Sequence, residues 1–284
     1  MIEPSLREHI ASDGYRLKFR HWAPENPRGI LIALHGIQSH SGWYDYSSRR
    51  LADTGFAVYF PDRRGSGLNG FQRGHAAHAM RLVNDVRSLR QLAIDEHCSG
   101  NAELQLPITI LGLSWGGKLA AVLAALFPQE FDKLVLLYPG LVTRIRPTWS
   151  QLLRLNLARD LEIVKHHIPI PLQDPALFTQ VAEWQSFIAN DPLALHTVSS
   201  SFLNAGRELD RLLMIHGSKI THPTLLLLAE DDAIIDNSAV RQRVSQFGTR
   251  QLKTRVYAAA RHTLEFEPNR EEVFGDLLDW LKTP

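Results

Sequence analysis

The sequence predicts an α/β protein in which helices flank a mostly parallel sheet of about eight strands. Five short runs are apolar at nearly every position: Ile30–Leu34, Phe56–Phe60, Ile108–Leu113, Lys133–Tyr138 and Thr224–Ala229. Such runs suit strands that are buried on both faces, as in a parallel sheet covered by helices. Segments with helical patterns fall between them, and this alternation is typical of α/β folds.

Further strands are expected at the two ends of the sheet. Leu6–Ser12 and Tyr15–Trp22 flank Asp13-Gly14, which is a hairpin signal. In the second of these segments apolar and basic residues alternate, as expected for a half-solvated edge strand. Gln251–Tyr257 is a more polar candidate and is also expected near an edge.

Three segments have apolar residues at helical spacing, and they predict the main helices. These segments are Arg81–His97, Trp115–Phe127 and Asn269–Lys282. The second is rich in alanine and leucine and stops before Pro128, where a helix would end.

A long stretch between Tyr138 and Thr224 interrupts the alternation of strands and helices. Its apolar residues form a helical stripe: Trp149, Leu152, Leu153, Leu157, Leu161 and Val164. So long an excursion between two strands is too large for a loop. We therefore expect a helical insertion over residues 141–204, between a first part of the core, 1–140, and a second part, 205–284.

Composition excludes several classes of protein. The net charge of +1 over 284 residues gives no basic excess for nucleic acid. Cys98 is the single cysteine, so an internal disulfide and a cysteine-rich zinc site are both excluded. The polar start does not resemble a signal peptide, and no apolar run nears the roughly 18 residues of a membrane span. A cytoplasmic protein is expected, and the sequence leaves its oligomeric state open.

One segment is a candidate catalytic motif: Gly112-Leu113-Ser114-Trp115-Gly116-Gly117 fits the pattern G-x-S-x-G. The motif alone is weak, but here it lies between a predicted strand and a predicted helix. That setting is typical of a nucleophile elbow, a sharp turn that exposes the serine hydroxyl. The turn leaves no room for side chains two residues either side of the serine, which explains Gly112 and Gly116.

A serine nucleophile needs a base, and in this motif class the chain order is serine, then an acid, then histidine. Among 13 histidines, His262 follows the last predicted strand and precedes the final helix. The acid should follow the strand Thr224–Ala229. Spacing does not separate Asp231 from Asp232 there, whereas Glu230 is expected to end the strand and Asp236 to cap a helix.

Two backbone N–H groups should stabilise the oxyanion that forms during attack. One is expected from Trp115, directly after the nucleophile. The other is expected from Ile37, because His35-Gly36-Ile37 follows an early strand and Gly36 lets the backbone approach the substrate.

These residues resemble the α/β-hydrolase fold, and more narrowly its monoacylglycerol lipase and lysophospholipase-like branch. The resemblance rests on Leu34–Asn69, on the elbow GLSWGG, on Ala229–Asp236 and on Ala258–Glu267. It implies that Asp232 is the catalytic acid. It also implies that the insertion, where the likeness is thin, is a cap over an acyl-binding tunnel.

The sequence departs from that branch near the nucleophile. Leu113 and Trp115 stand where the branch usually has histidine and often has methionine. Arg63 stands where members of the branch frequently have histidine, and Ala229 stands where they commonly have glycine. With Trp115 directly after the nucleophile, the elbow also resembles that of proline iminopeptidases, which share the fold. A specificity for monoglycerides is therefore not carried over.

The function expected from this sequence is hydrolysis of apolar acyl or aryl esters through an acyl-enzyme, without metal or cofactor. One alternative is an aminopeptidase, which needs a carboxylate such as Glu162 or Glu183 to hold the substrate amine. The other is a non-catalytic receptor for small molecules. Peripheral contact of the leucine-rich insertion with a membrane is a further prediction, which lack of co-sedimentation with liposomes would contradict.

Overall fold

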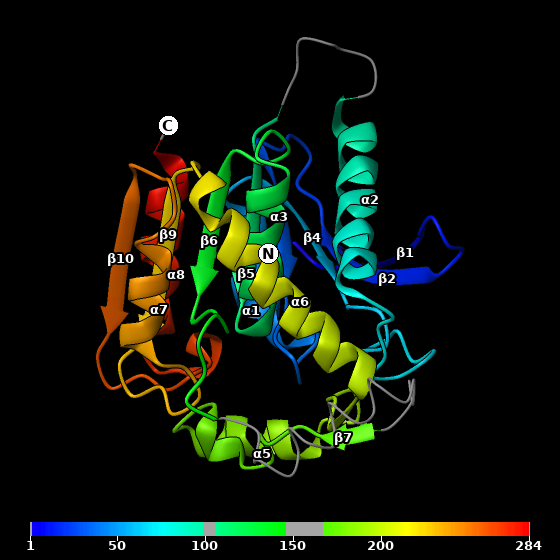
Figure 1. Cartoon of the computed structure of the whole chain (residues 1–284). Coiled ribbons are helices and arrows are strands. Elements are labelled where there is room, and N and C mark those ends of the chain that lie inside the picture. Colours follow the sequence, from blue (N-terminus) through cyan, green and yellow to red (C-terminus); the bar gives the residue numbers. More distant parts are fainter. Residues whose placement is uncertain (1, 99–105, 146–166, 284) are drawn as a thin grey trace.

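An eight-stranded sheet forms the centre of the molecule in a computed structural model that describes residues 2–98, 106–145 and 167–283 (Figure 1). The spatial order of its strands is β1 (Ser5–Ile10), β2 (Arg16–Trp22), β4 (Phe56–Pro61), β3 (Gly29–Leu34), β5 (Ile108–Leu113), β6 (Lys133–Leu137), β9 (Thr224–Ala229) and β10 (Leu252–Tyr257). The pairs from β4 to β10 are parallel, whereas β2 runs antiparallel to both β1 and β4. The predicted fold class is confirmed.

Burial explains why the five apolar runs become the middle of the sheet. Every residue of β3, β4, β5 and β9 is buried. β10 is exposed along most of its length and closes one end of the sheet, as its polar sequence predicts. At the other end the prediction was wrong in one respect, because β1 is the edge strand and β2 pairs on both sides.

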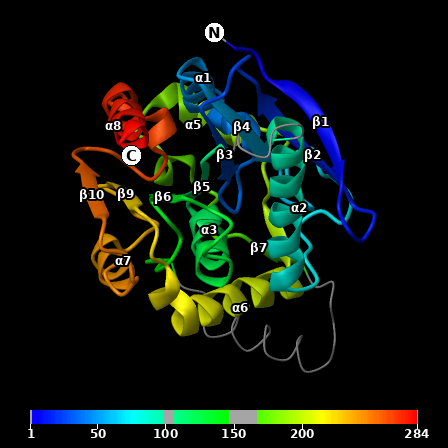
Figure 2. The ribbon, with the colours of Figure 1, turned by 90° about the horizontal axis from the view of Figure 1, so that it is seen from above.

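Helices cover both faces of the sheet (Figure 2). α1 (Asp45–Asp53) and α8 (Arg270–Lys282) lie on one face, and α2 (Ala79–Cys98), α3 (Trp115–Leu126) and α7 (Asn237–Val244) lie on the other. The predicted helices correspond to α2, α3 and α8. No helix among the described residues is long and apolar enough to cross a membrane.

Much of the described chain between β6 and β9 lies across the carboxyl ends of the strands (Figure 1). Its described elements are β7 (His167–Pro169), α5 (Ala182–Asn190), β8 (Thr197–Ser199) and α6 (Ser200–His216). β7 and β8 form a small antiparallel pair of their own, while α6 returns along α3. The predicted apolar stripe from Trp149 to Val164 falls outside the described residues.

Candidate active site

Ser114 occupies a strained turn between β5 and α3. Its backbone has φ 50° and ψ −122°, a left-handed conformation that non-glycine residues rarely adopt. A Cβ atom at Gly116 would lie 2.1 Å from the Leu34 carbonyl oxygen, and one at Gly112 would lie 2.5 Å from the Gly117 Cα. Only glycine therefore fits at these two positions, each two residues from the serine.

The structure brings Ser114, His262 and Asp232 together from three separate loops. The His262 Nε2 atom lies 2.9 Å from the Ser114 Oγ atom, and Nδ1 lies 2.8 Å from the Asp232 Oδ2 atom. His262 and Asp232 are each 2% exposed. This chain of hydrogen bonds has the order that a general base and its orienting carboxylate require.

Backbone donors hold the Asp232 carboxylate in place. Its Oδ1 atom accepts hydrogen bonds from the N–H groups of Ile234 and Ile235, at 2.8 and 2.9 Å. The neighbouring Asp231 is exposed, and its side chain takes no part in this arrangement. Asp236 accepts from the Ala239 N–H and caps α7, which confirms its predicted structural role.

The loop after β3 packs directly against Ser114. A Cβ atom on Gly36 would lie 3.2 Å from the Ser114 Cβ atom. Within the described ranges, neither the Ile37 N–H nor the Trp115 N–H donates to another protein group, and both residues line a pocket with Ser114. The two groups predicted to hold an oxyanion are therefore adjacent to the nucleophile and available to a ligand.

His35 is a structural part of this loop. It is 2% exposed, its Nδ1 atom lies 2.8 Å from the Gly36 carbonyl oxygen, and its Nε2 atom accepts from the Arg63 N–H at 2.8 Å. Burial, with the nearby charge of Arg63, holds the pKa of His35 well below its usual value. The neutral ring thus ties the loop after β3 to the turn after β4.

The pocket beside Ser114 has a volume of about 350 Å³. Aliphatic residues dominate its described walls: Ile37, Ile145, Ile168, Ile170, Leu172, Val198, Leu203, Ile234 and Ile235. The charged residues among the described lining are Lys118, Arg207 and Asp210, and Lys118 pairs with Asp210 at 2.7 Å. Trp115 also faces this space and stacks on Phe202, with 5.0 Å between ring centroids.

Sequence reasoning missed Tyr138, which lies beside the histidine. Its ring centroid is 4.8 Å from that of His262, and its backbone has φ 37°. Burial raises the pKa of its phenol well above the usual value. The Pro139-Gly140 pair after β6 is the available signal, because the Gly140 N–H donates to the Ser114 carbonyl oxygen at 2.6 Å.

Comparison with known protein families decides the classification. Residues 25–269 match the model described as serine aminopeptidase, S33. The chain belongs to this S33 serine aminopeptidase family. Its fold is that of the α/β hydrolases, and its relatives place it with the monoacylglycerol lipase-like branch, as the resemblance predicts.

Individual relatives of this S33 chain extend over nearly its whole length. A monoacylglycerol lipase from Mycolicibacterium smegmatis is 25% identical over 99% of this chain and 99% of its own. A soluble variant of monoglyceride lipase from Saccharomyces cerevisiae, solved with a substrate analogue, has a TM-score of 0.84 at 19% identity, covering 99% and 96% of the two chains. A thermostable carboxyl esterase from Bacillus coagulans has a TM-score of 0.82 at 20% identity, covering 99% and 98%.

Proposed function

We propose that this protein is a serine hydrolase of carboxylic esters with apolar acyl or aryl groups. The observation that carries the proposal is the hydrogen-bonded series Ser114–His262–Asp232 at the wall of an aliphatic pocket. The lipase and esterase names of its relatives support the same reaction class.

In the proposed reaction, the Ser114 hydroxyl attacks the ester carbonyl carbon while His262 Nε2 takes its proton. Asp232 orients the ring and stabilises the imidazolium that forms. The N–H groups of Ile37 and Trp115 donate to the oxyanion of the tetrahedral intermediate. The C–O bond to the alcohol then breaks, and the alcohol leaves with the proton from His262. Water repeats the sequence on the acyl-enzyme and releases the acid.

The walls of the pocket favour an apolar acyl or aryl group on the substrate. Binding such a group against aliphatic side chains is favourable by about 25 cal/mol for each Å² of apolar surface removed from water. Many of these side chains come from the segment after β6, which we propose to be a cap over the site. The boundary expected at residue 204 falls inside α6, so the proposed cap runs from residue 141 to Ser199.

The test is hydrolysis of p-nitrophenyl esters from acetate to palmitate, with Ser114→Ala alongside. We expect turnover by the wild type and a loss on the order of 10⁴–10⁶ in kcat for the variant. The acyl length that gives the highest kcat/KM then measures the usable depth of the pocket. A folded wild-type protein that cleaves none of these esters would overturn the proposal.

The family description makes an aminopeptidase the second candidate. That activity needs a carboxylate to hold the substrate amine, and Asp210 is the one carboxylate among the described residues that line the pocket. It is already paired with Lys118. Of the residues expected for this role, Glu183 is exposed and outside the pocket lining, and Glu162 falls outside the described residues. Cleavage of proline p-nitroanilide without ester hydrolysis would favour this candidate, and binding without turnover would favour a receptor.

A further inference from the structure

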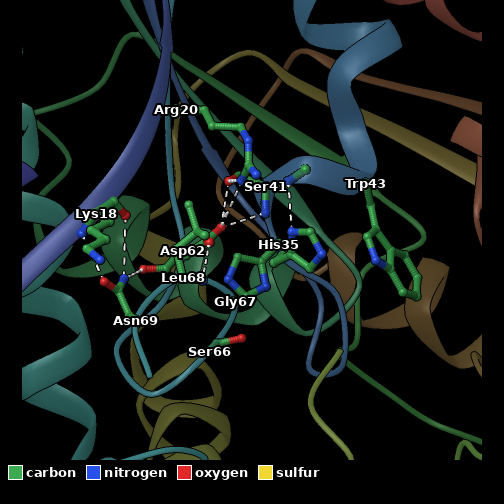
Figure 3. Close-up of polar contacts among 12 residues, drawn as sticks. Lys18, Arg20, His35, Ser41, Trp43, Asp62, Ser66, Gly67, Leu68 and Asn69 are labelled. Atoms are coloured by element: carbon green, nitrogen blue, oxygen red, sulfur yellow. Dashed lines mark hydrogen bonds and ion pairs between the residues drawn. The ribbon is translucent and has the colours of Figure 1, made fainter. Parts of the chain in front are cut away.

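Arg63 is a buried cation in the turn that follows β4. Its side chain is 8% exposed, and none of the described carboxylates lies within ion-pair distance of it. The adjacent Asp62 is fully buried, but its carboxylate oxygens accept hydrogen bonds from other residues (Figure 3). Its Oδ1 atom accepts from the Ser41 N–H and hydroxyl, at 2.7 and 2.5 Å, and its Oδ2 atom accepts from the Leu68 N–H at 2.8 Å.

The Arg63 guanidinium instead binds two backbone carbonyl groups of the loop after β3. One terminal nitrogen donates to the Gly36 oxygen at 3.1 Å, and the other donates to the Ile37 oxygen at 2.9 Å. The Gly36 oxygen has a second donor, the Nδ1–H of His35, because the Nε2 atom of that ring accepts from the Arg63 N–H. Two donors therefore hold one carbonyl oxygen.

This carbonyl belongs to the same peptide unit as the Ile37 N–H. The unit is planar and trans, so its C=O and N–H bonds point in opposite directions. Holding the oxygen from one side fixes the direction of the N–H on the other. A cation at the oxygen also draws electron density from the peptide, which makes the N–H a stronger donor.

The same guanidinium contacts the side chain of Trp115, the residue that carries the other predicted donor. Its central carbon lies 4.8 Å from the centroid of the Trp115 ring and 4.9 Å from that of Phe202. Such cation–π contacts stabilise a desolvated cation. Desolvation still lowers the pKa of Arg63 to about 9. Among the described residues, only carbonyl groups and aromatic rings hold this buried cation, and burying a charge in this way costs more free energy than packing alone would justify.

We propose that Arg63 is a positioning residue for the oxyanion hole, which aligns the Gly36–Ile37 peptide with Trp115 at the start of α3 and strengthens the Ile37 N–H as a donor. The inference rests on the proposed esterase function and extends it. Arg63 acts through the peptide and does not touch the substrate. Its effect therefore belongs to the transition state, where the oxyanion carries its charge.

The neighbouring Arg64 provides a matched control. It is also 8% exposed, but it binds Asp85 at 2.5 Å and Asp13 at 3.1 Å and makes no hydrogen bond to the loop after β3. The variants are Arg63→Lys, Arg63→Met and Arg64→Lys, each checked by thermal melting. A single ammonium group cannot reproduce the fork that binds both carbonyl groups.

The experiment measures kcat and KM for a short p-nitrophenyl ester, together with inhibition by a trifluoromethyl ketone. That ketone forms a tetrahedral oxyanion adduct with a catalytic serine. For both Arg63 variants we expect kcat to fall about 10- to 100-fold with little change in KM, and ketone affinity to fall in proportion. Affinity for the matching secondary alcohol, which forms no adduct, should stay constant, as should kcat in Arg64→Lys.

Each remaining outcome counts against the inference. Folded Arg63 variants with kcat within about threefold of the wild type would overturn it, as would an equal loss in Arg64→Lys. If Arg63→Met fails to fold, Arg63→Lys decides by the same criteria. A wild type without ester hydrolysis would overturn the proposed function and this inference together, whereas an active wild type with Arg63 variants of nearly the same kcat would overturn the inference alone.

Discussion

Two spaces adjoin the Ser114 hydroxyl, and they differ greatly in size and lining. The larger is the pocket of about 350 Å³ with mostly aliphatic walls. The smaller has a volume of about 10 Å³ and lies between Gly36, Ser39, Tyr44, Tyr138 and His262. An acyl or aryl group fits only on the larger side, while the smaller side has room for about one water molecule.

The smaller side contains a group of buried polar side chains beside apolar ones such as Leu172 and Phe178. The Ser39 hydroxyl accepts from the Gly36 N–H at 3.0 Å and lies 3.0 Å from the Tyr44 hydroxyl. The larger side has few such fixed contacts among its described residues. For the proposed esterase, the contrast predicts that the reacting groups are held on one side of Ser114, while substrate selection takes place on the other.

Asp232→Asn should produce the largest effect on the polar side. The asparagine N–H₂ group would donate to His262 Nδ1, so the proton would move to Nε2, which then could not accept from Ser114. We expect kcat to fall on the order of 10⁴, as measured triads do. Steady-state kinetics with a p-nitrophenyl ester checks this expectation.

Asp231→Asn is the control for that substitution. It makes the same chemical change one residue away on an exposed side chain. We expect its kcat to stay within about twofold of the wild type. Equal losses in the two variants would contradict the assignment of Asp232 as the orienting acid.

The buried carboxyl group of Glu265 should make the stability of the protein depend on pH. It is 1% exposed, its Oε1 atom accepts from the Ser47 N–H at 2.9 Å, and burial raises its pKa to about 7. Because the folded state binds this proton more tightly than the unfolded chain, Glu265 reduces stability as pH rises from about 4.5 to 7. A shift of this size corresponds to at most about 3 kcal/mol.

Glu265→Gln should remove that contribution, because the amide keeps an acceptor for Ser47 without a charge. Urea unfolding at pH 5 and pH 8 measures the effect. The variant should be more stable than the wild type at pH 8, by up to about 3 kcal/mol, and closer to it at pH 5. An unchanged difference between the two pH values would show that Glu265 does not titrate as the burial implies.

Local pattern and chain order predict part of the candidate site. The five central strands were predictable because a strand covered on both faces needs apolar residues throughout. Ser114 and His262 were predictable because the elbow needs glycines and the histidine loop follows the last strand. Spacing could not separate Asp231 from Asp232, because the side chains of adjacent loop residues point in different directions. Distance along the chain does not reveal which of them faces the histidine.

Contacts between distant loops could not be predicted in this way. The Arg63 guanidinium reaches Gly36 because β3 and β4 are neighbours in the sheet, and no periodicity in either segment encodes that contact. The phenol ring of Tyr138 packs against His262, and its backbone has a positive φ directly after β6. Both depend on tertiary packing, which overrides local preference.

Gly206→Leu tests the apolar side and should have the smallest effect on the chemistry itself. Gly206 lines the large pocket, and within 4 Å a Cβ atom there would meet only Trp115 Nε1, at 3.6 Å. A leucine side chain would extend into the space proposed for long acyl groups. We expect kcat/KM for p-nitrophenyl palmitate to fall about 10- to 100-fold relative to acetate.

Gly275→Leu is the matched control for Gly206→Leu. It makes the same change inside α8, at a position where a Cβ atom has no neighbour within 4 Å. Both substitutions raise helix propensity by a similar amount, so general effects on stability should be shared. Only Gly206→Leu should alter the palmitate-to-acetate ratio. A ratio unchanged in both variants would mean that long acyl groups are not held between α6 and Ser114, and that selection on this side of the serine uses a different wall.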